Sequence, residues 1–200
     1  AIYKIRACKL DLRLRIGTLM HRRNLLAAIE NYAARYPEEV GVVGRFKALI
    51  ENHAECFDRD CWHGHITGSA WLVSPDQQHL LLTHHRKLNM WLQLGGHSDG
   101  DPSTDEVAMR EAHEESGLAV QLLNPDIFDL DVHEIPERKN DPAHYHFDVR
   151  YQIQAGGEKF RISEESLDLA WVKIDELERY TKEESILRMR RKWHESNNKN

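Results

Sequence analysis

Residues 96–118 read GHSDGDPSTDEVAMREAHEESGL, and this stretch decides the fold. The sequence predicts a glycine turn followed by a short helix that carries Arg110, Glu111, Glu114 and Glu115. Residues three and four apart share one face of a helix, so the three carboxylates are expected to converge. Anions at this spacing repel one another unless a divalent cation lies among them. The stretch therefore predicts a helix that binds a metal ion.

Both ends of this helix are marked in the sequence. Ser103 followed by Glu106 predicts a capping box, in which each side chain satisfies a backbone N–H. Gly117 is placed for a left-handed stop at the other end. Small apolar residues between them, Val107, Ala108 and Ala112, predict a face that lies close to a sheet.

The same stretch resembles the Nudix box, G-x5-E-x7-R-E-U-x-E-E-x-G-U, where U is a bulky apolar residue. The matching positions are Gly96, Arg110, Glu111, Glu114, Glu115, Gly117 and Leu118. Ala112 is a small version of U. Pro102 stands where the box has its first glutamate, and Asp99 and Asp101 are the nearby acids that could partly replace it.

The resemblance implies a Nudix-type α/β/α sandwich with a mixed sheet, and the sequence places a helical hairpin before it. We expect the hairpin helices at residues 16–36 and 38–55. Strands are expected at residues 66–73, 79–84, 118–123, 127–135, 145–155 and 167–172, with further helices at 175–179 and 182–194. We predict two parts, an N-terminal helical extension over residues 1–59 and a Nudix hydrolase domain over residues 60–200.

By the same resemblance, Glu111, Glu114 and Glu115 are the metal ligands, and the backbone carbonyl of Gly96 is a further one. Mg²⁺ or Mn²⁺ is the expected cofactor, because hard cations prefer oxygen ligands. Arg110 is expected to orient a box carboxylate through a bidentate pair.

The general base varies among proteins with this box, so several glutamates stay open as candidates. Glu111 or Glu115 could serve, or a glutamate in the loop before the strand at 167–172. Of Glu164 and Glu165 in that loop, we favour Glu164; the alternative is a solvated acidic loop.

Thirteen histidines invite a search for clusters. His97 lies on the predicted turn, His144 and His146 share one strand face, and His133 is on a neighbouring candidate strand. Imidazoles can ligate softer ions such as Mn²⁺ or Zn²⁺ or donate to phosphate, so His97, His144 and His146 are candidate substrate-binding residues. Arg86, in a basic loop, is another. The alternative for the histidines is polar strand surface or hydrogen bonding to the backbone, and for Arg86 it is a solvated turn.

The predicted function is a metal-dependent pyrophosphohydrolase that cleaves a phosphoanhydride bond in a nucleoside diphosphate linked to another moiety, with water attacking phosphorus. One alternative is a non-catalytic Nudix domain that senses nucleotides. Another is an isopentenyl-diphosphate isomerase-like enzyme, because those isomerases carry a C-G-H-P segment with a catalytic cysteine. Here the segment reads Gly95-Gly96-His97-Ser98, so the cysteine is absent.

Composition limits the partners. The chain has 200 residues, 40% of them hydrophobic, and a net charge of −6. This balance argues against binding a nucleic-acid polymer, and no apolar run approaches a membrane span. We expect a small phosphorylated, nucleotide-derived substrate, with monomer and homodimer both left open. Four aromatic residues could stack a base, and a place in the core is the alternative for each: Trp62, Trp71, Trp91 and Tyr145.

Three cysteines are too few and too sparse for a disulfide framework. We therefore expect the reducing cytoplasm and free thiols. Cys56, Cys61, His63 and His65 lie within ten residues, which raises the alternative of a zinc site. Structural zinc sites usually draw pairs of ligands from two separated turns, so free thiols are favoured.

Overall fold

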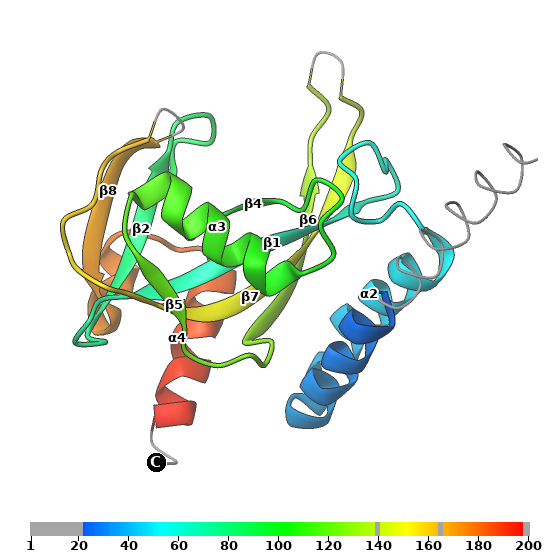
Figure 1. Ribbon diagram of the computed structural model, residues 1–200, viewed down its shortest axis with the longest axis horizontal. Helices are drawn as coiled ribbons and strands as arrows, with labels where there is room; N and C mark the ends of the chain where they lie inside the picture. Colours follow the sequence, from blue (N-terminus) through cyan, green and yellow to red (C-terminus); the bar gives the residue numbers. More distant parts are fainter. Residues whose placement is uncertain (1–21, 139–140, 164–165, 198–200) are drawn as a thin grey trace, which may run out of the picture.

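The computed structural model describes residues 22–138, 141–163 and 166–197. A mixed eight-stranded sheet lies between helices, with α3 on one face and α4 on the other (Figure 1). The strands are β1 (His65–Val73), β2 (His79–His85), β3 (Met90–Leu92), β4 (Leu94–His97), β5 (Val120–Leu122), β6 (Asp129–Ile135), β7 (His144–Ala155) and β8 (Ser166–Lys173). The helices are one over residues 22–35, η1 (Pro37–Glu39), α2 (Val40–Asn52), α3 (Thr104–Ser116), η2 (Ile174–Arg179) and α4 (Glu184–Asn197). The predicted α/β/α sandwich is confirmed.

The centre of the sheet is the parallel pair of β1 and β7, and the path runs β3-β2-β1-β7-β5. Every other named strand pair in the described ranges is antiparallel. β1 also pairs with β4, β7 with β6, and β2 with β8. Helix α3 lies directly on β1, because a Cβ atom at Gly68 would be 2.7 Å from the Thr104 carbonyl oxygen and 2.9 Å from Val107 Cγ1.

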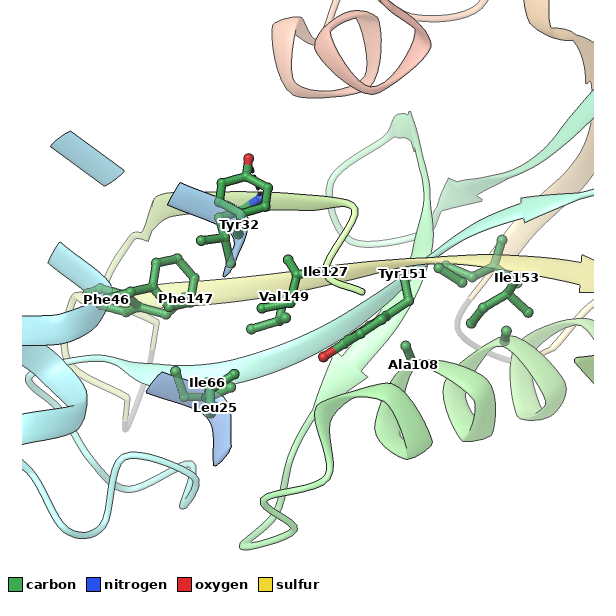
Figure 2. Packing of buried hydrophobic residues seen from close by; sticks show 14 of the residues in the cluster. Leu25, Tyr32, Phe46, Ile66, Ala108, Ile127, Phe147, Val149, Tyr151 and Ile153 are labelled. Atoms are coloured by element: carbon green, nitrogen blue, oxygen red, sulfur yellow. Dashed lines mark hydrogen bonds between the residues drawn. The ribbon is translucent and has the colours of Figure 1, made fainter. Parts of the chain in front are cut away.

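Alternate residues of the central strands face two separate cores. On the α3 side, Phe147 and Val149 of β7 pack with Ala108 and with Tyr32 and Phe46 of the N-terminal helices (Figure 2). On the other side, a second cluster packs the sheet against α4; its aromatic members are Trp71, Phe128 and Trp193. The N-terminal helices thus share a core with the sheet, and the predicted division near residue 60 stays a prediction.

The expected helices and strands are found with small shifts of their ends. The predicted helix at 16–36 is seen over residues 22–35, and its first part lies outside the described residues. The second helix ends at Asn52 rather than at residue 55. Among the residues described, no helix has both the length and the apolar character to span a lipid bilayer.

The ends of α3 differ in how well they were predicted. Gly117 takes the predicted left-handed conformation, with φ of 69°, and its N–H donates to the His113 carbonyl at 2.7 Å. The capping box is wrong: Ser103 is the N-cap, but its side chain makes no capping hydrogen bond. Instead, the Asp101 carboxylate accepts the N–H of Ser103 at 2.9 Å.

The predicted glycine turn is also wrong, because Gly95 and Gly96 lie within strand β4. β4 pairs antiparallel with β1, which places Gly96 opposite Gly68. The chain turns later, where Asp99 and Gly100 have φ values of 50° and 84°. Strands β3 and β4 were missed because they are three and four residues long and show no alternating apolar pattern.

A buried ionic network joins the layers at Asp129 of β6. The Arg150 guanidinium, from β7, donates to the Asp129 carboxylate at 3.1 Å. From α4, Lys192 donates to it at 2.6 Å and Arg188 at 2.9 Å and 2.7 Å, while Lys192 also donates to the Tyr32 hydroxyl at 2.5 Å. Burial alone would raise the pKa of Asp129, but the Arg188 hydrogen bond and the nearby cations hold this pKa below its usual value.

Substituting Asp129→Ala is expected to lower the free energy of unfolding by roughly 3–5 kcal/mol, because buried cations lose their counter-charge. Urea unfolding of the two proteins measures this difference. Arg179→Ala is the control, since Arg179 is exposed and pairs with Glu176 on the surface; its cost should stay below about 1 kcal/mol. Equal costs for the two variants would contradict the assigned role of Asp129.

The network also predicts acid sensitivity. Burial opposes ionisation of Asp131, yet the His133 hydrogen bond and the charges of Arg150 and Arg188 lower its pKa, as happens at Asp129. Groups with lowered folded pKa values stabilise the protein fully above their unfolded pKa of about 3.9, and this stabilisation is lost as pH falls through the folded values. The free energy of unfolding should therefore drop below about pH 4, less steeply in Asp129→Asn. If the free energy of unfolding falls equally steeply with pH in the two proteins, Asp129 does not contribute to the acid sensitivity.

Candidate active site

Two of the predicted box glutamates, Glu111 and Glu115, lie against the glycines of β4. Glu111 sits so close to Gly96 that a Cβ atom there would overlap its carboxylate. Glu115 is 9% exposed, and its Oε1 accepts the Gly95 N–H at 2.8 Å. Glu114 is exposed. We refer to these five residues, two glycines and three glutamates, as the box cradle.

The carboxylates are spread along the box cradle. Two groups of three potential ligands among the described residues have all their ligand atoms within 4.8 Å of one another, and the three box glutamates form neither of them. The reason is visible in their contacts, since Glu115 is bonded to Gly95 and Glu111 lies against Gly96. The cradle therefore presents oxygen donors along a surface that α3 and β4 build together.

Arg110 ties α3 to the end of β4. Its Nη2 donates to the His97 carbonyl at 3.1 Å and to Glu111 Oε1 at 3.3 Å. The expected bidentate pair with one carboxylate is thus replaced by one bond to a carboxylate and one to the backbone. Arg110 Nη1 also lies 3.6 Å from Asp101, the acid beside Pro102. Asp101 therefore supplies a carboxylate to Arg110 close to the position where the box glutamate is missing.

The other nearby acid, Asp99, is paired with Arg59. Arg59 Nη2 donates to its Oδ2 at 2.6 Å, and Arg59 Nε also donates to this carboxylate. The hydrogen bonds from Arg59 lower the pKa of Asp99, although partial burial opposes this shift. Asp101 is thus the acid that pairs with Arg110 of helix α3.

A histidine cluster adjoins the box cradle at His97. It comprises His65, His97, His133, His144 and His146. The His97 ring centroid is 5.2 Å from that of His65 and 5.0 Å from that of His146. The predicted proximity of His144 and His146 is observed, with ring centroids 5.3 Å apart. Burial, with the neighbouring imidazoles, lowers the pKa of His65 to about 4 and of His146 to about 2.

Comparison with known proteins decides the family. The sequence profile of the NUDIX domain matches residues 64–192, which is more than half of the chain and includes the box helix, β4 and the histidine cluster. The chain belongs to the Nudix family. It is accordingly a hydrolase of phosphorus-containing anhydrides.

Solved Nudix structures share the fold. A NUDIX-family hydrolase from Clostridium perfringens is 25% identical, with a TM-score of 0.50, over 64% of this chain and 95% of that one. The MutT protein from Methanosarcina mazei is 20% identical, with a TM-score of 0.52, over 67% and 95%. The dihydroneopterin triphosphate pyrophosphohydrolase of E. coli is 16% identical, with a TM-score of 0.50, over 62% and 91%. No curated protein sequence matches this chain.

Two other predicted site residues are Arg86 and Glu164. Arg86 Nη2 donates to the Ser166 carbonyl at 2.9 Å, so this arginine contacts the start of β8. Glu164 lies outside the described residues. Of the candidates for the general base, the structure therefore describes only Glu111 and Glu115, and Glu164 is known from the sequence alone.

The four proposed zinc ligands do not form one group within the described part of the chain. Cys61 and His63 lie with His53, all with ligand atoms within 4.8 Å of one another, whereas His65 belongs to the histidine cluster. Cys56 is buried in the core, where burial raises its thiol pKa to about 12. Both described cysteines are free thiols, as expected.

Asp148 is a buried residue near the box cradle that the sequence alone did not identify. Its carboxylate accepts hydrogen bonds from Thr67 at 2.9 Å and Ser69 at 2.7 Å. It also accepts one from Gln93 at 3.3 Å. Ser69 lies opposite Gly95 in the sheet, so Asp148 supports the strand that carries the box cradle. Its position two residues after His146 on the polar face of β7 is the signal that could have identified it.

The cradle geometry predicts separate effects of two glycine substitutions. Gly96→Ala should displace the flexible Glu111 carboxylate and lower the hydrolysis rate about 10²-fold, with a change below about 1 kcal/mol in the free energy of unfolding. Gly157→Ala is the control, because a Cβ atom there meets nothing within 4 Å. Both quantities are measured on a substrate that the parent enzyme hydrolyses. A parental rate in Gly96→Ala would contradict the cradle.

Proposed function

We propose that this Nudix hydrolase is a metal-dependent pyrophosphohydrolase acting on a nucleoside diphosphate linked to another moiety. Water attacks one phosphorus atom, and the bond from that phosphorus to the bridging oxygen breaks. The observation that carries the proposal is the box cradle, in which Glu111 and Glu115 contact the β4 glycines. All three box glutamates are present, which favours catalysis over the alternative of a nucleotide sensor.

The donors of the cradle fit a hard divalent cation. Glu111, Glu114 and Glu115 offer carboxylate oxygens, and Gly96 offers its carbonyl, which are the ligand types that Mg²⁺ and Mn²⁺ prefer. When bound, such an ion polarises a phosphoryl oxygen and lowers the pKa of the attacking water. The missing side chain at Gly96 leaves the space that Glu111 occupies.

The remaining roles follow from the contacts of each residue. Arg110 positions Glu111 and the end of β4 through its two hydrogen bonds. The Gly95 N–H fixes Glu115 in the same way. We retain Glu111, Glu115 and Glu164 as candidates for the general base, which removes a proton from the attacking water.

The isomerase alternative is disfavoured by the space around Gly95. A Cβ atom at Gly95 would overlap the Ser69 side chain and lie 2.8 Å from the Gly68 carbonyl oxygen. A cysteine at this position, as in the C-G-H-P segment, would therefore require the neighbouring strand to move. This crowding favours hydrolysis over isomerisation at the box cradle.

A small nucleotide-derived substrate is supported by an exposed aromatic residue beside the histidine cluster. Trp62 is 41% exposed, and its ring centroid is 5.5 Å from that of His144. An exposed indole of this kind offers a surface on which a base can stack. Trp71, by contrast, is fully buried in the second core. Free buried thiols at Cys56 and Cys61 support a reducing location, and we infer the cytoplasm.

Glutamate substitutions on α3 test the proposal. Glu114→Gln and Glu115→Gln should each abolish turnover of nucleoside diphosphate derivatives, because the amide removes a negative charge while keeping the shape of the side chain. Release of phosphate or nucleotide from a broad substrate panel is measured with Mg²⁺, with Mn²⁺ and with a chelator. Turnover should require the metal.

Glu106→Gln is the matched control, since Glu106 is exposed in the first turn of the same helix. It should keep the parental rate. Tight nucleotide binding by the parent protein without any metal-dependent release would favour the sensor. Formation of an isoprenoid isomer would favour the isomerase.

A further inference from the structure

Strand pairing gathers five imidazoles at one end of the sheet. They come from the adjacent strands β4, β1, β7 and β6, in which His97 pairs with Thr67, His65 with His146, and His146 with His133. His144 precedes His146 by two residues on β7. Because residues two apart share a strand face, and paired residues share a sheet face, all five side chains lie on one side.

Three of these rings are close enough to share a ligand. The ligand nitrogens of His65, His144 and His146 all lie within 4.8 Å of one another. His65 is 1% exposed, and neither of its ring nitrogens makes a hydrogen bond of normal distance and angle among the described residues, although the backbone of Cys61 lies close enough to favour the charged ring. A buried imidazole normally pairs both nitrogens. The unpartnered ring of His65, directed at two other imidazoles, therefore indicates a place for a bound ion.

A hydrogen bond to the backbone orients the His144 ring so that its other nitrogen is available as a ligand. Its Nδ1 lies 2.8 Å from the Pro142 carbonyl oxygen, so Nδ1 carries the proton and Nε2 keeps its lone pair. Metal-binding histidines usually make this type of second contact, which orients the ring.

We propose that His65, His144 and His146 bind a transition-metal ion such as Zn²⁺, at a site separate from the carboxylates of the box cradle. Imidazole nitrogen suits Zn²⁺ and related ions, whereas Mg²⁺ prefers oxygen. Three protein ligands leave a fourth tetrahedral position open, as in catalytic zinc sites. His97 directly follows Gly96 of the cradle, and successive strand residues point to opposite faces, so the proposed ion lies on the sheet face opposite the contact of Gly96 with Glu111.

The test is binding of Co²⁺, an optical substitute for Zn²⁺, to the full chain after treatment with a chelator. Intense visible absorption, which four-coordinate Co²⁺ shows and six-coordinate Co²⁺ on the oxygen donors of the box cradle does not, should report one such ion per chain without a thiolate-to-cobalt charge-transfer band, and Zn²⁺ should displace it. His144→Gln and His146→Gln should each weaken binding at least about tenfold. Circular dichroism confirms that each variant is folded; a variant that unfolds is replaced by the corresponding asparagine.

Three control variants separate this site from its neighbours. His133→Gln alters an exposed histidine of the same cluster, Cys61→Ser alters the group with His53 and His63, and Glu114→Gln alters the box cradle. All three should bind Co²⁺ as tightly as the parent. Parental binding in both His144→Gln and His146→Gln, or loss of binding in Cys61→Ser, would overturn the proposal. Because the readout is absorption, absence of hydrolysis would overturn only the proposed function.

Discussion

The carboxylate of Asp129 is the point where the layers of the protein meet. It lies on β6 and receives cations from β7 through Arg150 and from α4 through Arg188 and Lys192. Lys192 extends the network to Tyr32 of the N-terminal helix. Buried charges are tolerated only when their partners are in place. Docking of α4 and of the N-terminal helix is therefore tied to β6 and β7, the strands that also carry part of the histidine cluster.

Strand β7 connects this network to the candidate site. Its polar face carries His146, Asp148 and Arg150 in succession, which places an imidazole, a carboxylate and a guanidinium along one line. Its other face carries Phe147 and Val149 in the core. A shift of one residue in the pairing would exchange the two faces. The same register therefore stabilises the core and assembles the histidine cluster.

Local features could be predicted from the sequence, and non-local ones could not. The limits of α3 and the role of Gly117 follow from nearby residues, so they were predicted well. The cap at Ser103 was wrong because Asp101 competes for its N–H. His65 was grouped with sequence neighbours, whereas parallel pairing with a distant strand places it beside His146. No local pattern contains that contact. The catalytic roles of the box residues rest on the resemblance and stay predictions.

The parallel pairing of β1 with β7 has a consequence for the order of folding. Thr67 and Asp148, which bond across it, are 81 residues apart. Closing a loop of this length costs chain entropy before any contact compensates for it, so such pairs form late, whereas a helix such as α3 forms from local contacts. In the newly made chain the turns of the acidic helix can therefore begin to form locally, and the site is completed only when β7 joins β1.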